Sequence, residues 1–151
     1  MSKCTMLINS ISVPIQIGIY VDDMIVESIK LEGHTSDVLI ENVDKIMQKM
    51  DITKIIYANG PGSYMAIKLT YIMLKTIKMI KGIDFYGISG FELNANAPIK
   101  AMGKLYFIKE KETIITNKFE EDIKQEFWLP SDLSVISLQK ENLPHYMLPA
   151  V

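Results

Sequence analysis

The first third of the chain alternates between apolar and polar positions with a period of two. Isoleucine or valine stands at every second position of residues 15–21, which is typical of a strand with one buried face. Similar apolar runs lie before it at residues 6–8 and after it at residues 24–31, and Asp22-Asp23 supplies turn residues between the last two. The pattern predicts three consecutive antiparallel strands.

Two later stretches change to a spacing of three and four residues, which is typical of helices. Residues 35–50 form the first, an amphipathic stretch whose apolar positions are Leu39, Val43, Ile46 and Met50. Residues 64–81 form the second, and their first turns are apolar around nearly the whole circumference. Such a helix needs cover on two sides, so we expect the sheet on one side and another helix or a partner chain on the other.

Shorter apolar runs complete the predicted elements. Residues 53–58 and 83–88 are expected to be strands on either side of the second helix, followed by a short helix at 89–95. Further strands are expected at 104–109, 112–117 and 133–138, and a further short helix at 119–128. Antiparallel strands that lead into crossover helices and parallel strands make a mixed α/β sheet with helices packed on it.

Composition then narrows the function classes. The chain has 151 residues, is 48% hydrophobic and carries a net charge of −2. All 16 basic residues are lysines, which argues against a self-sufficient nucleic-acid binder and excludes an arginine clamp on phosphate. With one cysteine, Cys4, and two histidines, neither a disulfide nor a metal site is expected. No apolar stretch is long enough for a secretory signal or a membrane span, so we expect a cytoplasmic protein without membrane contact.

One loop contains residues that could bind a phosphate group. Residues 59–63, Asn-Gly-Pro-Gly-Ser, lie between a buried strand and the start of a helix, where unpaired backbone N–H groups attract anions. Gly60 and Gly62 would let a phosphate approach the backbone closely, with Ser63 beside them and Lys68 further along the helix. The spacing is not that of a Walker A loop. A simple tight turn, with Lys68 in solvent, accounts for the same residues.

The same loop begins a resemblance to a known family. Residues 59–69 resemble the signature N-G-P-G-S-F-T-G-L-R-I of the TsaB (YeaZ) family, the non-catalytic paralogue of the TsaD transferases. Residues 82–92 resemble the family segment I-P-L-V-G-V-S-S-L-E, and residues 33–39 resemble the H-S-E-x-L-L that opens its first helix. The resemblance is good over residues 53–93, fair over residues 5–50, and poor in the last third of the chain.

The resemblance implies a fold and a role. The fold is the actin/Hsp70/sugar-kinase-like, or ribonuclease H-like, fold, with a full N-terminal lobe at residues 1–98 and a reduced C-terminal lobe at residues 99–151. The role is that of a scaffold pseudoenzyme in the synthesis of N6-threonylcarbamoyladenosine beside the anticodon of tRNAs. The implied partners are a TsaD-like transferase, bound through the two helices, and a TsaE-like ATPase, while the tRNA is contacted only indirectly.

Two sets of candidate site residues follow. The partner-binding set lies on the two predicted helices: Leu39, Val43, Met47, Met65, Leu69, Ile72 and Met73. The phosphate-binding set combines the end of the first strand with the loop: Asn9, Ser10, Gly60, Gly62, Ser63 and Lys68. A methionine-rich surface adapts readily to partners, but ordinary core packing accounts for the first set equally well. The same helices could also pair with a second copy of the chain.

The chain departs from the family where nucleotide chemistry would need it. The aspartate of the family's first strand is Asn9 here, and the signature arginine is Lys68. A carboxylate that could hold Mg²⁺ is therefore missing from that position. We expect no cofactor requirement, although ATP or ADP could sit at a partner interface. The alternatives are a small nucleotide-binding phosphotransferase or ATPase, and, less favoured, a self-associating peptidase-like protein, for which the sequence offers no nucleophile paired with a base.

Overall fold

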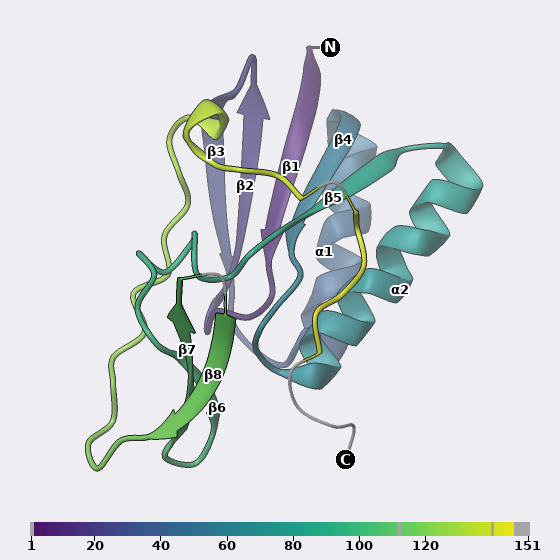
Figure 1. Ribbon diagram of the computed structural model, residues 1–151. Helices are drawn as coiled ribbons and strands as arrows, with labels where there is room; N and C mark the ends of the chain where they lie inside the picture. The colour runs from purple at the N-terminus through teal and green to yellow at the C-terminus, as the bar shows by residue number, and fades with distance from the viewer. Residues whose placement is uncertain (1, 112, 140, 147–151) are drawn as a thin grey trace.

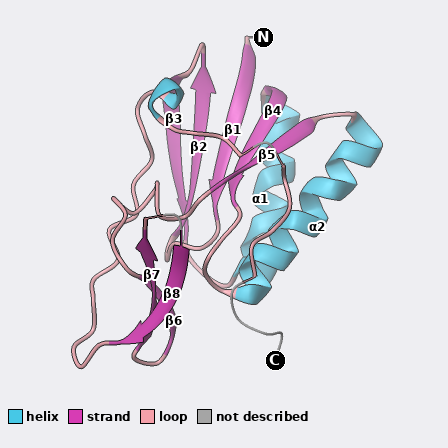
Figure 2. Ribbon diagram, viewed as in Figure 1, coloured by secondary structure: helices cyan, strands magenta, loops and turns pink. Residues whose placement is uncertain are grey.

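The computed structural model describes residues 2–111, 113–139 and 141–146, and Figures 1 and 2 show the arrangement of its elements. In chain order these are β1 (Lys3–Asn9), β2 (Ile15–Val21), β3 (Met24–Leu31), α1 (Thr35–Lys49), β4 (Asp51–Ala58), α2 (Tyr64–Lys81), β5 (Asp84–Ile88), β6 (Ile99–Met102), β7 (Leu105–Glu110), β8 (Thr113–Lys118) and the 3₁₀ helix η1 (Leu133–Val135). Within these described ranges, neither helix combines the length and apolar character that crossing a membrane would require.

β1 is the central strand of a five-stranded sheet with the order β3-β2-β1-β4-β5. It pairs antiparallel with β2 and parallel with β4. β2 pairs antiparallel with β3, and β4 pairs parallel with β5. Parallel neighbours need a crossover connection, which α1 and α2 supply. The predicted mixed sheet, with its three consecutive antiparallel strands, is confirmed.

Both helices pack on one face of this sheet (Figure 1). The Ser63 side chain caps the first turn of α2 by accepting a hydrogen bond from the Ala66 N–H at 3.4 Å, and Gly82 ends the helix with a left-handed φ of 72°. Alternate strand side chains and the inner faces of both helices form a continuous core. Its fully buried members include Met6, Ile8, Ile17, Ile19, Leu39, Val43, Ile55, Tyr57, Leu74 and Phe85.

The opposite face of the sheet is covered by an extended part of the chain. Apolar side chains of residues 127–138 pack against side chains of β1, β2, β4 and β5. The Tyr20 hydroxyl donates to the Pro130 carbonyl at 2.7 Å, and burial raises the pKa of Tyr20 above its usual range. The Ile25 N–H donates to the Ser131 carbonyl at 2.9 Å. This segment is therefore held to the sheet by backbone hydrogen bonds as well as by apolar contacts.

Two elements predicted in this part of the chain are wrong. Residues 119–128 contain no helix, and residues 133–138 contain no strand but only the short η1 and irregular backbone. Backbone groups here bond to distant partners, as where the Trp128 N–H donates to the Leu93 carbonyl at 3.0 Å. An extended chain spans about 3.3 Å per residue against 1.5 Å in a helix. A short extended segment can therefore cover a sheet face that the same number of helical residues could not.

The short helix predicted for residues 89–95 is also wrong, because consecutive turns replace it. The side-chain amide of Asn94 donates to the Ala97 and Pro98 carbonyls, both at 3.2 Å. Ala95 and Asn96 have positive φ values of 50° and 57°. A side chain that bonds to nearby backbone competes with helical hydrogen bonds, so the turns close around Asn94.

A second sheet, β6-β7-β8, is antiparallel. Strands β7 and β8 confirm the two predicted strands, each displaced by one residue, whereas β6 has only four residues and was missed by sequence reasoning. Phe91, Ile99 and Phe107 form an apolar cluster, with Ile11 and Phe127 packed against it. This cluster joins residues before and after the predicted lobe boundary between residues 98 and 99. The boundary itself stays a prediction.

Replacement of Tyr20 by Phe tests how firmly the extended segment is held. Tyr20→Phe removes the donor to the buried Pro130 carbonyl, so we expect the free energy of unfolding to fall by about 1–3 kcal/mol. Urea unfolding followed by circular dichroism measures the change. Tyr86→Phe, at a half-buried position on β5, is the matched control and should change stability by no more than about 0.5 kcal/mol. Equal stability of the two variants would contradict the assignment.

Candidate functional site

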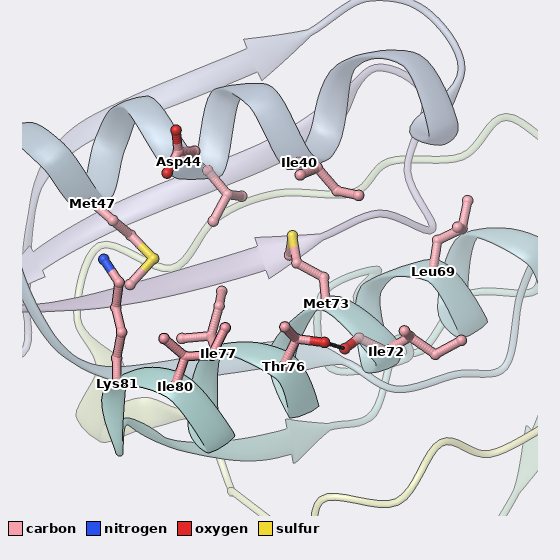
Figure 3. A pocket seen from close by; sticks show the side chains of 11 residues that line it. Ile40, Asp44, Met47, Leu69, Ile72, Met73, Thr76, Ile77, Ile80 and Lys81 are labelled. Atoms are coloured by element: carbon pink, nitrogen blue, oxygen red, sulfur yellow. Dashed lines mark hydrogen bonds between the residues drawn. The ribbon is translucent and has the colours of Figure 1, made fainter.

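A groove of about 340 Å³ lies between α1 and α2, and side chains of the two helices point toward one another across it (Figure 3). From α1 it is lined by Ile40, Val43, Asp44 and Met47, and from α2 by Leu69, Ile72, Met73, Thr76, Ile77, Ile80 and Lys81. Of these lining residues, only Asp44 and Lys81 carry charge. The groove is therefore an apolar surface with charges only at isolated points.

The sequence of α2 explains why this surface is apolar. One side of the helix faces the core with Ala66, Ile67, Thr70, Met73 and Leu74. On its other side Ile72, Met79 and Ile80 are 51%, 82% and 75% exposed. The expected cover is thus present on the sheet side, and the outer side has none in the part of the chain that the structure describes. Adjacent exposed apolar side chains of this size commonly mark an interaction surface.

Two polar side chains of the groove, those of Thr76 and Asp44, already have partners within their own helices. The Thr76 hydroxyl donates to the Ile72 carbonyl at 2.9 Å (Figure 3). The Asp44 carboxylate accepts a hydrogen bond from Gln48 Nε2, also at 2.9 Å. An occupant would therefore gain mainly by burying apolar side chains, since few polar atoms here need a new partner.

The structure brings most of the predicted partner-binding residues to this groove, namely Val43, Met47, Leu69, Ile72 and Met73. Leu39 and Val43 are only 1% exposed and Met73 only 8%, so these three belong to the core. Met65 is 56% exposed near the start of α2 and is not among the lining residues. The binding role of the whole set stays a prediction.

Sequence reasoning missed three isoleucines that line the groove: Ile40, Ile77 and Ile80. A signal for each of them was present in the helical spacing. Positions 69, 73, 76 and 80 are spaced by four, three and four residues, which places them along one stripe of a helix. Ile77 follows Met73 by four residues on the same stripe. Ile40 likewise precedes Val43 by three residues and Met47 by seven, so it shares their stripe on α1.

The loop before α2 is packed too tightly around its glycines to leave open space there. A Cβ atom on Gly62 would lie 2.6 Å from Ile11 Cγ2, and one on Gly60, whose φ is +130°, would collide with the His145 carbonyl oxygen. The Ser63 hydroxyl is used as the cap of α2. Glycine is therefore required at both positions for close packing within the chain.

Asn9 and Ser10, at the end of β1, also bond within the chain. Asn9 is fully buried, and its Oδ1 accepts hydrogen bonds from the Ile11 N–H at 3.0 Å and the Ser12 N–H at 3.3 Å. Its Nδ2 has no partner among the described residues. The Ser10 and Thr70 hydroxyls are 2.7 Å apart. These side chains fix the turn after β1 and join it to α2.

Lys68 does not reach back to the loop. Its Nζ lies 5.7 Å from the centre of the Tyr64 ring, a cation–π contact along the exposed side of the helix. The structure thus brings Gly60, Gly62 and Ser63 together, places Asn9 and Ser10 at the adjoining strand end, and leaves Lys68 apart. Phosphate binding by this set stays a prediction.

The C-terminal segment lies over this loop, and no periodic pattern in the sequence indicates this contact. The His145 N–H donates to the Asn59 carbonyl at 2.7 Å. The rings of Tyr64, the first residue of α2, and Tyr146 lie 4.6 Å apart between centroids. In the described ranges of the chain, no group of three or more His, Cys, Asp and Glu side chains is placed to hold a metal ion.

The fold and the groove together define a mixed α/β protein with an exposed apolar surface between its two crossover helices. Comparison with solved structures finds two proteins of similar fold. The structure is similar to YeaZ from Pseudomonas aeruginosa, with a TM-score of 0.55 and 10% identity, covering 79% of this chain and 66% of that one. It is also similar to an uncharacterized protein with similarity to peptidase YeaZ from Pseudomonas aeruginosa, with a TM-score of 0.60, 10% identity and coverage of 89% and 73%.

No protein-family model and no curated protein sequence matches the chain. The chain thus has the YeaZ fold, and the resemblance to the TsaB (YeaZ) family is confirmed at the level of the fold. At 10% identity the likeness concerns the fold alone.

Substitution at Gly62 tests whether this glycine serves packing. In Gly62→Ala the new methyl group would press on Ile11, so we expect a loss of about 1–3 kcal/mol in the free energy of unfolding. The double variant Ile11→Ala/Gly62→Ala removes the opposing methyl groups. Its loss should be smaller than the sum of the two single losses by about 1 kcal/mol or more. Urea unfolding of the four proteins gives the coupling, and strictly additive losses would count against the packing role.

Proposed function

We propose that this protein is a TsaB-like scaffold subunit in the synthesis of N6-threonylcarbamoyladenosine in tRNA. In this proposal a TsaD-like transferase binds in the groove between α1 and α2. The observation that carries the proposal is the uncovered apolar surface of that groove on a chain with the YeaZ fold.

The exposed side chains of the groove suit such a partner. Ile40 on α1 and Ile72 on α2 are 56% and 51% exposed, and both line the groove. Apolar side chains at the centre of an interface usually contribute most of its binding energy. Met47, which lies between the helices, has an unbranched side chain that can adapt to a partner's surface. The partner should therefore present an apolar helix or ridge.

The end of β1 supports a scaffold over an enzyme. Asn9 stands where the resemblance implies an aspartate, and its Oδ1 accepts two backbone N–H groups. An amide held in this way makes a poor ligand for Mg²⁺, which prefers carboxylates and water. The neighbouring loop is occupied by the chain's own C-terminal segment. A subunit that acts by binding a transferase needs neither a Mg²⁺ ligand at Asn9 nor an open loop after β4.

The charge of the chain supports an indirect relation to tRNA. Without arginine and with a net charge of −2, the protein lacks the basic footprint of an RNA-binding surface. In the proposal the transferase contacts the tRNA, and a TsaE-like ATPase joins the pair in the cytoplasm. ATP or ADP, if the complex binds it, sits at the interface with these partners.

A charge placed in the groove tests the proposal. In Ile72→Lys an ammonium group would be buried on binding, so we expect the dissociation constant for the TsaD-like transferase of the same organism to rise at least about tenfold. Isothermal titration calorimetry measures the affinity. Val26→Lys is the matched control, because Val26 is 60% exposed on β3 and does not line the groove. Both variants should keep the wild-type circular dichroism spectrum and melting temperature.

Three outcomes would count against the proposal. The wild-type protein and the transferase could stay separate at micromolar concentration with and without ATP. Ile72→Lys could bind as tightly as the wild type. Alternatively, sedimentation could show a homodimer that Ile72→Lys dissociates while no transferase binds, which would assign the groove to a second copy of the chain. Turnover of Mg-ATP by the isolated protein would favour the phosphotransferase alternative.

A further inference from the structure

Asn59 is the point at which the C-terminal segment attaches to the five-stranded sheet. This residue is fully buried directly after β4. Its Nδ2 donates to Gln139 Oε1 at 2.6 Å and to the Leu143 carbonyl at 3.0 Å, and its Oδ1 accepts from Gln139 Nε2 at 3.3 Å. Its own carbonyl accepts the His145 N–H at 2.7 Å. Every polar group of the Asn59 side chain is thus used to hold residues about 80 positions later in the chain.

Three further contacts extend the same attachment. The Tyr57 hydroxyl donates to the Asn142 carbonyl at 2.6 Å, and burial is the main cause that raises the pKa of Tyr57 above its usual range. The Gln139 N–H donates to the Gly87 carbonyl at 2.9 Å. The ring of Tyr146 packs against that of Tyr64. The segment is therefore held at both of its ends and in its middle.

Glycines provide the space for this arrangement. A Cβ atom on Gly87 would lie 2.5 Å from Asn59 Nδ2, and one on Gly60 would collide with the His145 carbonyl oxygen. Any other residue at position 87 would displace the amide that holds the segment. Any other residue at position 60 would displace the segment itself, besides being strained at a φ of +130°.

The hydrogen bonds to residues 142–145 are made to backbone groups and not to side chains. The carbonyls of Asn142 and Leu143 accept hydrogen bonds from the Tyr57 hydroxyl and the Asn59 amide. The His145 N–H donates to the Asn59 carbonyl. The side chains of Leu143 and His145 are exposed. Pro144 lies between them and favours an extended backbone at the residue before it. This is how a protein recognises an extended peptide, with affinity from main-chain hydrogen bonds and specificity from a few side chains.

We propose that Asn59, with Tyr57, Gly60, Tyr64 and Gly87, forms a peptide-binding site whose ligand is the chain's own segment 139–146. The ligand class is an extended peptide that offers a glutamine amide at one end and a tyrosine ring at the other. The tether gives the segment an effective concentration on the order of millimolar, so it fills the site in cis. The loop that the sequence suggests as a phosphate site thus binds peptide. This inference does not rest on the proposed function.

His145 allows a test with a closely matched pair of variants. His145→Pro removes the N–H that bonds to Asn59, while His145→Ala keeps it and changes only an exposed side chain. We expect amide hydrogen exchange in residues 139–146 to be at least tenfold faster in His145→Pro than in His145→Ala. Exchange in β1 and β4 should be the same in both, which shows that the fold persists. Equal exchange of the segment in the two variants would overturn the proposal.

Binding in trans completes the test. A fluorescent synthetic peptide of the sequence Gln-Lys-Glu-Asn-Leu-Pro-His-Tyr should bind His145→Pro, as measured by anisotropy, at least tenfold more tightly than it binds the wild type or His145→Ala. The same peptide with proline in place of histidine should not bind. Tyr146→Ala, which removes the ring contact with Tyr64, is a second release variant should His145→Pro fail to fold. A folded, released variant that does not take up the peptide would overturn the proposal.

Discussion

The parallel pairing of β1 with β4 is the constraint on which the rest of the structure depends. β1 is already bonded on its other side to β2, so the chain can reach β4 only by crossing over a face of the sheet, which it does with α1. The step from β4 to β5 moves in the same direction with α2. Crossovers share one handedness, so two successive steps in the same direction place both helices on the same face. The groove between them follows from the strand order.

The two surfaces that result are opposite in character. The groove between α1 and α2 has exposed isoleucines and few unsatisfied polar atoms, so it favours a partner that buries apolar area. The loop after β4 is built from polar backbone and an amide, and the amide is bonded to Gln139 and Leu143. Its hydrogen bonds are thus used to hold the chain together. In the proposal the groove serves association, and the hydrogen bonds of the loop serve to hold the C-terminal segment.

Most of the regular elements could be predicted because each has a period of its own. The alternation in β2 and the three-to-four spacing in α1 and α2 result from local geometry, and a buried face makes that geometry visible in the sequence. The segments at 89–98 and 119–138 have no such period. Around residue 94 the Asn94 amide bonds to the nearby Pro98 carbonyl, a local competition with the helix that an apolar period does not reveal. At Pro130 the partner is the Tyr20 hydroxyl, 110 positions away, which local sequence cannot identify.

The sequence by itself determined the order of strands and helices from β1 to β5, the apolar character of α2 and the tight turn at Gly60 and Gly62. Only the tertiary structure decided which apolar residues are core, such as Leu39 and Met73, and which are surface, such as Ile72. A helical period indicates that a face is apolar but not what lies against it. Only the folded chain, likewise, brings the C-terminal segment onto the loop, because contacts between residues about 80 positions apart depend on where the sheet places its strand ends.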